Sequence, residues 1–122
     1  MLGGMTGTTD ADCLFCKIVA REVPADVVHE TGTTLAFRDI DPQAPTHVLV
    51  VPRQHHPDAA ALVAEDPRVT VDLLNAVAAV AEQEGLGEGY RIVFNTGPQA
   101  QQSVPHVHAH VLGGRAMTWP PG

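Results

Sequence analysis

The chain has 122 residues and a formal net charge of −7, and 44% of its residues are hydrophobic. This length suits one domain around a single core. The negative charge argues against a nucleic-acid backbone or an anionic membrane as the main partner, because both require a positive protein face. No stretch approaches the roughly 18 apolar residues of a membrane span, and the N-terminus lacks a secretion signal, so we expect a cytoplasmic protein.

The N-terminal region combines an irregular leader with a short helix. Residues 1–11 are rich in Gly and Thr without apolar periodicity, so we expect a disordered leader before a single domain over residues 12–122. Apolar residues at helical spacing predict a helix over residues 13–22. It carries Cys13 and Cys16, the only two cysteines. With no sign of secretion, this C-x-x-C pair favours a metal site or free thiols over a structural disulfide.

The next segment is typical of strands. Two β-prone runs, residues 27–31 and 34–39, flank a Gly-Thr pair and predict a hairpin. Residues 40–46 hold two prolines and predict an extended loop. Residues 47–51 are nearly all apolar, which indicates a strand that is covered on both faces.

The second half predicts one long helix and two more strands. Asp66 and Pro67 are typical of a helix start, and an apolar stripe runs from there to Gly85, a residue suited to ending a helix. Residues 90–95 predict a strand, and residues 106–112 predict the last strand beside it. The sequence therefore predicts an α+β domain with about five mainly antiparallel strands, a short N-terminal helix and one long helix, both helices on one face.

The last predicted strand alternates three histidines with apolar residues. Successive side chains of a strand point to opposite faces, so His106, His108 and His110 would share one face and the apolar residues the other. At about 3.4 Å rise per residue, neighbouring histidines would lie roughly 7 Å apart, and one small ligand could touch two or three of them. This pattern favours a binding or catalytic site over a solvated surface.

The pattern His-φ-His-φ-His-φ-φ, with φ apolar, resembles the motif of the histidine triad (HIT) superfamily. Further segments resemble its Hint branch, the histidine triad nucleotide-binding proteins: CLFCKI from residue 13, AFRDI from 36, PQAPTH from 42, QSV from 102, GGR from 113 and WPPG from 119. The resemblance covers residues 12–122. It implies a HIT-like fold and a homodimer with a sheet continuous across both subunits.

The resemblance also implies an activity. Hint proteins hydrolyse the P–N bond of purine nucleoside 5′-phosphoramidates, such as AMP-NH2 or AMP-lysine, through a covalent nucleotidyl-histidine. His108 matches the nucleophile, while His110 and His47 match partners that contact the phosphate and tune protonation. Ser103 matches the hydroxyl that binds the α-phosphate and the leaving group. The remaining nucleotide-binding positions contact the ribose, the base and the phosphate region in turn: Asp39, Ile40 and Asn95.

Two positions depart from the Hint pattern. Hint relatives usually carry two glycines just before the Gln-Ser pair, where this chain has Ala100-Gln101. Pro105 replaces an aromatic residue that is common there. Both departures bear on the choice of leaving group more than on the reaction.

Imidazole chemistry suits this activity without a metal. Neutral imidazole attacks phosphorus and leaves a labile adduct, so one hard hydrolysis becomes two easier displacements. Because the ordinary histidine pKa lies near 6.5, neighbouring histidines can divide attack and proton donation between them. Ser103 and backbone N–H groups can stabilise developing negative charge. We therefore expect no cofactor requirement for catalysis.

The cysteine pair leaves a structural metal open. Some bacterial relatives carry a zinc site, and by that resemblance the ligands would be Cys13, Cys16, His55 and His106. Two thiolates and two imidazoles suit a closed tetrahedral Zn²⁺ site. Reduced thiols without metal are the alternative.

Other functions also remain open at this stage. One is hydrolysis of dinucleoside polyphosphates, as in the Fhit branch, although the Trp-Pro-Pro-Gly tail favours Hint. Another is a metal-binding protein in which all three motif histidines ligate one cation. A third is a nucleotide-binding scaffold without turnover. An exposed apolar helix and sheet edge would support the homodimer.

Overall fold

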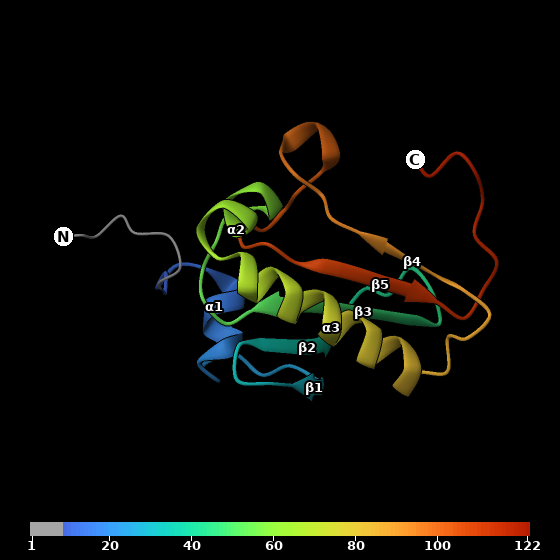
Figure 1. The fold of residues 1–122 in the computed structure, drawn as a ribbon, viewed down its shortest axis with the longest axis horizontal. Coiled ribbons are helices and arrows are strands. Elements are labelled where there is room, and N and C mark those ends of the chain that lie inside the picture. Colours follow the sequence, from blue (N-terminus) through green and yellow to red (C-terminus); the bar gives the residue numbers. More distant parts are fainter. Residues whose placement is uncertain (1–8) are drawn as a thin grey trace.

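The computed structural model describes residues 9–122; the first eight residues, most of the predicted leader, lie outside the described part. The elements in chain order are α1 (Leu14–Val19), β1 (Val27–Glu30), β2 (Thr34–Arg38), β3 (Thr46–Pro52), α2 (Ala59–Glu65), α3 (Pro67–Gln83), β4 (Tyr90–Val93), a short 3₁₀ turn (Pro98–Ala100) and β5 (Ala109–Gly113). The strands form one sheet in the order β1-β2-β3-β5-β4, and every pairing is antiparallel (Figure 1). The predicted α+β class and five-stranded sheet are confirmed.

The central strand explains the layering of the molecule. Every residue of β3 is buried, as its continuous apolar run predicted. One face of the sheet, which includes Val48, Val50 and Val111, packs against α2 and α3. The other face, which includes Leu49 and Leu35, packs against α1. The expectation that both predicted helices lie on one face was therefore wrong, because a strand apolar at successive positions needs cover on both sides.

The helix boundaries follow the local capping chemistry. The Asp66 side chain accepts a hydrogen bond from the Val69 N–H at the start of α3, and Gly85 has φ +72° just past its end, as the sequence predicted. The sequence reading missed α2. Its signal was present, because the Asp58 carboxylate caps this alanine-rich helix through the Ala61 N–H.

The strand predicted over residues 106–112 begins later, at Ala109. The reason is Pro52 at the end of β3, which has no N–H to donate to a ladder. The Val107 N–H instead donates to the His56 carbonyl. The alternation of side chains nevertheless extends back through Val107, which is buried under α3, while the neighbouring histidines lie on the α1 side.

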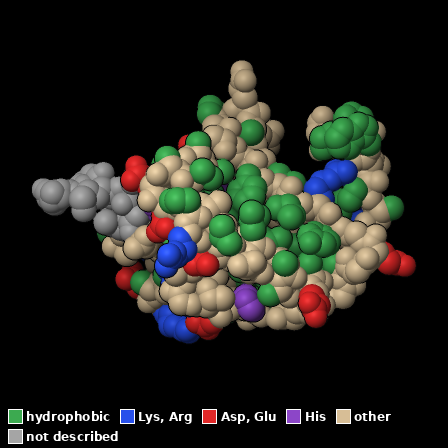
Figure 2. Space-filling view, in the orientation of Figure 1, with side chains coloured by type: hydrophobic (Ala, Val, Ile, Leu, Met, Phe, Trp, Pro, Cys, Tyr) green, Lys and Arg blue, Asp and Glu red, His purple; other side chains and the backbone are tan. Residues whose placement is uncertain are grey.

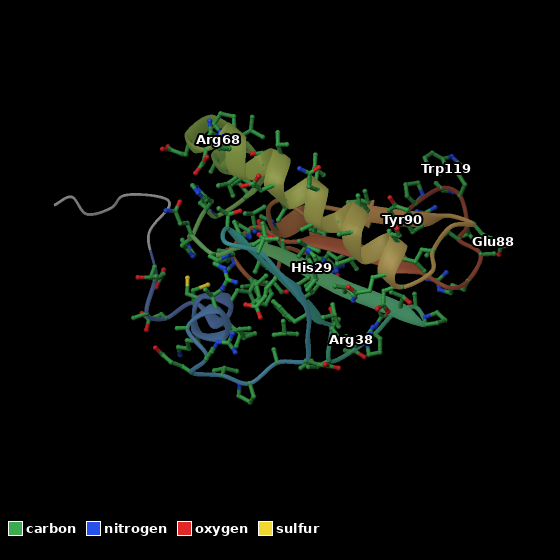
Figure 3. The ribbon with its side chains drawn as sticks, turned by 60° about the horizontal axis from the view of Figure 1, so that its bottom comes forward. His29, Arg38, Arg68, Glu88, Tyr90 and Trp119 are labelled. Carbon is green, nitrogen blue, oxygen red and sulfur yellow. The ribbon has the colours of Figure 1, made fainter. Side chains whose placement is uncertain are left out.

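β4 is one of the two edge strands of the sheet, at the end opposite β1. Its residues Tyr90 and Ile92 are exposed, as are Leu74 on α3 and Trp119 in the C-terminal tail. Figure 2 shows apolar side chains gathered over α3 and towards β4 and the tail. Figure 3 places Tyr90 and Trp119 at the same end of the molecule, with α3 and α1 on opposite sides of the strands. No helix within residues 9–122 is long and apolar enough to cross a membrane.

Candidate active site and metal cluster

A pocket of about 320 Å³ opens between α1, the end of β2 and the histidine motif. Its walls are mainly apolar side chains of α1 and of the segment that follows it, residues 23–25. Five of the predicted site residues line it: Asp39, Ile40, Ser103, His108 and His110. A mostly apolar pocket with a few polar groups at one end is typical of a small-molecule site.

His108 presents an unshared electron pair. Its Nδ1 lies 2.8 Å from the His106 carbonyl oxygen, so Nδ1 carries the proton and donates it to that oxygen. The ring is buried, and burial lowers the pKa of His108, with the bond to His106 and the charge of Asp39 opposing the shift. The imidazole is therefore neutral at pH 7, with the lone pair on Nε2. This is the protonation state that a nucleophile requires.

His47 and His110 form a hydrogen-bonded pair. His47 Nδ1 accepts the Gln43 N–H at 3.0 Å, which places the His47 proton on Nε2. This Nε2 lies 2.8 Å from His110 Nδ1 and 3.4 Å from Asp39 Oδ2, so the His110 nitrogen is the better acceptor. The neutral His110 ring then keeps its proton on Nε2. His110 is thus a hydrogen-bond donor at the pocket, beside the acceptor nitrogen of His108.

Burial keeps this pair neutral. It is the main cause that lowers the pKa of His110 to about 4, and the neighbouring rings of His108 and His47 lower it further. Burial also lowers the pKa of His47, against the opposing charge of Asp39. The short contact between His47 and Asp39 is therefore no ion pair at pH 7.

The other predicted site residues make fewer hydrogen bonds to the protein than the histidines do. Asp39 accepts the Asp41 N–H through Oδ1, which leaves Oδ2 for a ligand hydroxyl. Ile40 is fully exposed at the mouth of the pocket, and Ser103 is exposed in the loop before the motif. Asn95 follows β4 and is half-buried, but it is not among the residues that line the pocket.

Three supporting residues escaped the sequence reading. Gln43 fixes the His47 tautomer through its backbone N–H, which only the fold reveals. Phe15 of α1 packs edge-to-face on His108, with ring centroids 5.0 Å apart. The Gln102 side chain ties the loop before the motif to the Pro57 carbonyl at 2.7 Å. The QSV segment was noted in the sequence, but nothing in it revealed this anchoring role.

The two departures from the Hint pattern lie near Ser103. Ala100 ends the 3₁₀ turn, and Gln101 follows it with φ +61°. This left-handed conformation favours glycine, so a relative with glycine there adopts the turn more easily. Pro105 lines a second groove of about 420 Å³, which shares Ser103 with the first pocket.

A second cluster forms on the other side of His108. Cys13, Cys16, His55 and His106 each bring one ligand atom to a common point. His106 Nδ1 lies 3.4 Å from the Cys13 Sγ, 3.5 Å from the Cys16 Sγ and 3.2 Å from the His55 Nδ1. Tetrahedral zinc, with Zn–S near 2.3 Å and Zn–N near 2.0 Å, separates its ligand atoms by about 3.3 to 3.7 Å. The donor spacing therefore fits zinc.

The His106 ring is prepared to be a ligand. Its Nε2 lies 2.9 Å from the Pro52 carbonyl, so it carries the proton and leaves the Nδ1 lone pair facing the thiols. Burial lowers the pKa of His106 to about 4, which keeps the ring neutral. Burial raises the pKa of the Cys16 thiol to about 11, so a thiolate at pH 7 needs a nearby cation.

Other metal arrangements fit the hydrogen bonds less well. Asp39, His47 and His110 also lie within reach of one another. The facing Nε2 of His47 already carries a proton, so it has no electron pair for a metal. Within residues 9–122, the three motif histidines do not bring ligand atoms to one point, because His106 faces the cysteines and His110 faces His47.

Comparison with known families agrees with this geometry. A family model described as the HIT domain matches residues 20–117, most of the chain. The chain belongs to the HIT family. The resemblance to that superfamily, drawn from the histidine motif, is confirmed.

Relatives of this HIT protein carry informative names. An uncharacterised HIT-like protein of Synechococcus elongatus is 52% identical, over 91% of this chain and 97% of that protein. A Zea mays protein named 14 kDa zinc-binding protein is 48% identical, over 93% of this chain and 90% of its own length. An Arabidopsis thaliana protein named adenylylsulfatase HINT1 is 47% identical, over 93% and 79% respectively.

Solved structures show the same fold. A HIT family hydrolase from Legionella pneumophila has a TM-score of 0.87 and 48% identity, over 91% of this chain and all of that one. A histidine triad nucleotide-binding protein from Candida albicans has a TM-score of 0.78 and 32% identity, over 89% of this chain and 83% of that one. These relatives place the HIT protein in the Hint-like branch, as its sequence segments implied.

Proposed function

We propose that this HIT protein hydrolyses the P–N bond of purine nucleoside 5′-phosphoramidates through a nucleotidyl-His108 intermediate. The single observation that carries the proposal is the Nε2 lone pair of a neutral His108 in a pocket that also holds Asp39. In the proposed complex Ile40 contacts the base, Asp39 accepts the ribose hydroxyls, and Asn95 lies towards the phosphate.

The proposed reaction has two displacements at phosphorus. His108 Nε2 attacks the α-phosphate in line with the departing nitrogen, and the P–N bond to the amine breaks as a P–N bond to His108 forms. The departing amine takes a proton from the Ser103 hydroxyl or His110 Nε2–H at the pocket, and that donor recovers a proton in the second step. Water then attacks the adduct and gives its proton to the group that protonated the amine, which releases the nucleoside monophosphate and restores both neutral His108 and the donor. His47 keeps the His110 proton on the pocket side.

A second candidate reaction follows from the relative named adenylylsulfatase. The same attack on the α-phosphate of adenylyl sulfate would expel sulfate, which needs no proton to leave. A substrate panel separates the candidates: AMP-NH2, adenylyl sulfate and a dinucleoside polyphosphate, each assayed after metal chelation. We expect AMP-NH2 to turn over fastest. A preference for either other substrate would reassign the activity, and AMP binding without any turnover would indicate a scaffold.

We also propose a structural zinc on Cys13, Cys16, His55 and His106. The donor spacing supports it, as does the maize relative named for zinc binding. The zinc would link α1 to the segments after β3 and before β5, and it would take no part in the chemical step. Metal analysis of untagged, reduced protein tests this, and the absence of zinc would leave the alternative of free thiols.

We propose, finally, that two chains form a homodimer through β4 and α3. The edge strand presents Tyr90 and Ile92, and the outer face of α3 presents Val71 and Leu74, all of them exposed. A patch of this kind beside an unpaired strand edge is typical of a subunit interface, and pairing of two β4 edges would continue the sheet. A monomer by light scattering at micromolar concentration would contradict this.

A further inference from the structure

Phe15 lies between two histidine clusters. One is the group of His47, His108 and His110 at the pocket, and the other is the four-residue group of Cys13, Cys16, His55 and His106. Phe15 lies on α1 between the two cysteines and is 4% exposed. Its ring centroid lies 5.0 Å from that of His108 and 5.9 Å from that of His106, at interplanar angles of 88° and 74°. Phe15 also lines the pocket. One side chain therefore touches a ring of each cluster and the candidate nucleotide site.

The orientation of His108 depends on this contact. Among the described residues, the hydrogen bond from Nδ1 to the His106 carbonyl is the one that the His108 ring makes. A single hydrogen bond fixes one ring atom but leaves the ring plane free to tilt about it. The rings of Phe15 and His110, with centroids 5.0 and 4.9 Å away, restrict that tilt. The direction of the Nε2 lone pair is thus set by a hydrogen bond together with ring packing.

The position of Phe15 depends in turn on the cluster of four ligands. α1 has six residues, which is too short to be stable without tertiary contacts. Phe15 packs on Phe37 at 5.5 Å, and the two thiols of the helix face His106. A cation bound there would fix α1, and so Phe15, relative to the motif. Without a cation, the contacts that hold the helix within residues 9–122 are weak sulfur contacts and apolar packing.

We propose that Phe15 is a positioning residue for His108, and that through Phe15 the four-ligand cluster sets the direction of the His108 lone pair. The link to turnover rests on the proposed function, whereas the geometry of His108 can be measured without any substrate. Phe15 takes no part in bond making. It holds the ring that does.

The first test compares Phe15→Leu with Val19→Ala. Val19 is half-buried in the same apolar cluster on α1 but does not line the pocket, so its truncation controls for general loosening of the helix. We expect Phe15→Leu to shift or broaden the His108 side-chain ¹⁵N resonances. It should lower kcat about ten- to hundredfold, since misplacement by about 1 Å has that effect, with a smaller change in KM. Val19→Ala should lower Tm while keeping the resonances and kcat.

Two outcomes of this first test would overturn the positioning role. One is a Phe15→Leu protein whose His108 resonances match the wild type. The other is an equal loss of kcat in Val19→Ala, which would make the effect one of stability alone.

The second test uses zinc alone as the probe. Wild-type and Phe15→Leu proteins are compared after zinc loading and after chelation under reducing conditions, with the His108 resonances and AMP affinity as readouts. We expect zinc removal to move the His108 resonances in the wild type and much less in Phe15→Leu. Failure to take up zinc, equal shifts in both proteins, or no shift in either would overturn the coupling.

Failure of the proposed function would look different. In that case the wild type would turn over none of the substrates, although its His108 resonances would still respond to Phe15→Leu. Normal turnover with unresponsive resonances would instead reject the positioning role.

Discussion

The two histidine clusters differ in where their electron pairs point. In the cluster of Cys13, Cys16, His55 and His106, a proton on His106 Nε2 is held by the Pro52 carbonyl, and the Nδ1 lone pair converges with the thiols. Two residues later, the His106 carbonyl holds the Nδ1 proton of His108, and its Nε2 lone pair remains for the pocket. In each ring a backbone carbonyl accepts the hydrogen bond of one nitrogen, Nε2 in His106 and Nδ1 in His108, so the two lone pairs lie on opposite ring nitrogens. The first arrangement suits the proposed metal ligand, and the second suits the proposed nucleophile.

Removal of the proposed nucleophile should give the largest effect. His108→Ala deletes the Nε2 lone pair, so we expect turnover of AMP-NH2 to fall at least about 10⁴-fold. AMP should still bind, because Asp39 and Ile40, the proposed contacts of the ribose and the base, still line the pocket. Steady-state kinetics and calorimetry measure the two quantities. The partly buried surface residue His29 gives a matched control, because His29→Ala removes an imidazole outside both clusters.

A trapped intermediate would sharpen this result. Mass spectrometry of wild-type protein quenched during turnover of a slow substrate should find a nucleotidyl group on His108. An adduct on a different histidine, or full activity in His108→Ala, would overturn the mechanism.

Loss of a cluster ligand should act on stability and metal content more than on chemistry. Cys16→Ser and His106→Ala each remove one of four donors, so we expect bound zinc to fall from about one per chain to near zero. Tm should fall, while kcat should fall far less than in His108→Ala, because the His108 lone pair remains. Elemental analysis and thermal unfolding measure these effects. If Cys16→Ser lost activity as completely as His108→Ala, the division between the two clusters would not hold.

Asp39 belongs to the pocket and should affect binding. Asp39→Asn keeps the size of the side chain but removes the charge, so hydrogen bonds to ribose hydroxyls become weaker. We expect about tenfold weaker AMP binding, the equivalent of about 1.4 kcal/mol, with a smaller change in kcat. A 2′-deoxy analogue of AMP is the control. Removal of the 2′-hydroxyl should weaken binding to the wild type more than binding to Asp39→Asn. Equal losses would place the ribose elsewhere.

The sequence predicted which side chains of the two clusters share a face better than it predicted the state of their ring nitrogens. Alternation along residues 106–112 predicted which side chains share a face, and it holds although β5 begins only at Ala109. The resemblance to Hint proteins supplied the proposed metal ligands, but the sequence could not show which ring nitrogen each histidine presents. That choice depends on the carbonyls of Pro52 and His106, which become neighbours of the rings only in the folded chain.

For the fold as well, the sequence predicted some features and not others. Caps and apolar stripes located α3, and the apolar run located β3. The placement of α1 opposite α3 was missed, because amphipathic spacing shows that a helix has a buried face but not which side of the sheet receives it. The role of Phe15 follows directly from that placement.

The smallest effect should come from pH near neutrality, where both clusters keep the same charge. Burial lowers the pKa of His106 and His110 to about 4, below the unfolded value near 6.5. A group whose folded pKa is lowered contributes stability that is complete above the unfolded value and lost as pH falls through the folded value. Metal-free protein should therefore show nearly constant Tm from pH 8 to about 7, and Tm should then decline between about pH 6.5 and 4. The kcat of the folded protein should hold to lower pH and decline only as the pH approaches the folded pKa of His110, about 4.

A pH series sharpens the comparison because zinc should change only one of the two clusters. In zinc-loaded protein the metal competes with protons for His106, so part of the acid-induced loss of Tm should move to lower pH. The His47–His110 pair has no such protection, and kcat should still decline over the original range. Thermal unfolding and kinetics of loaded and metal-free protein test this. Parallel displacement of both curves would show that the clusters titrate as one unit, since separate clusters would leave the kcat curve in place.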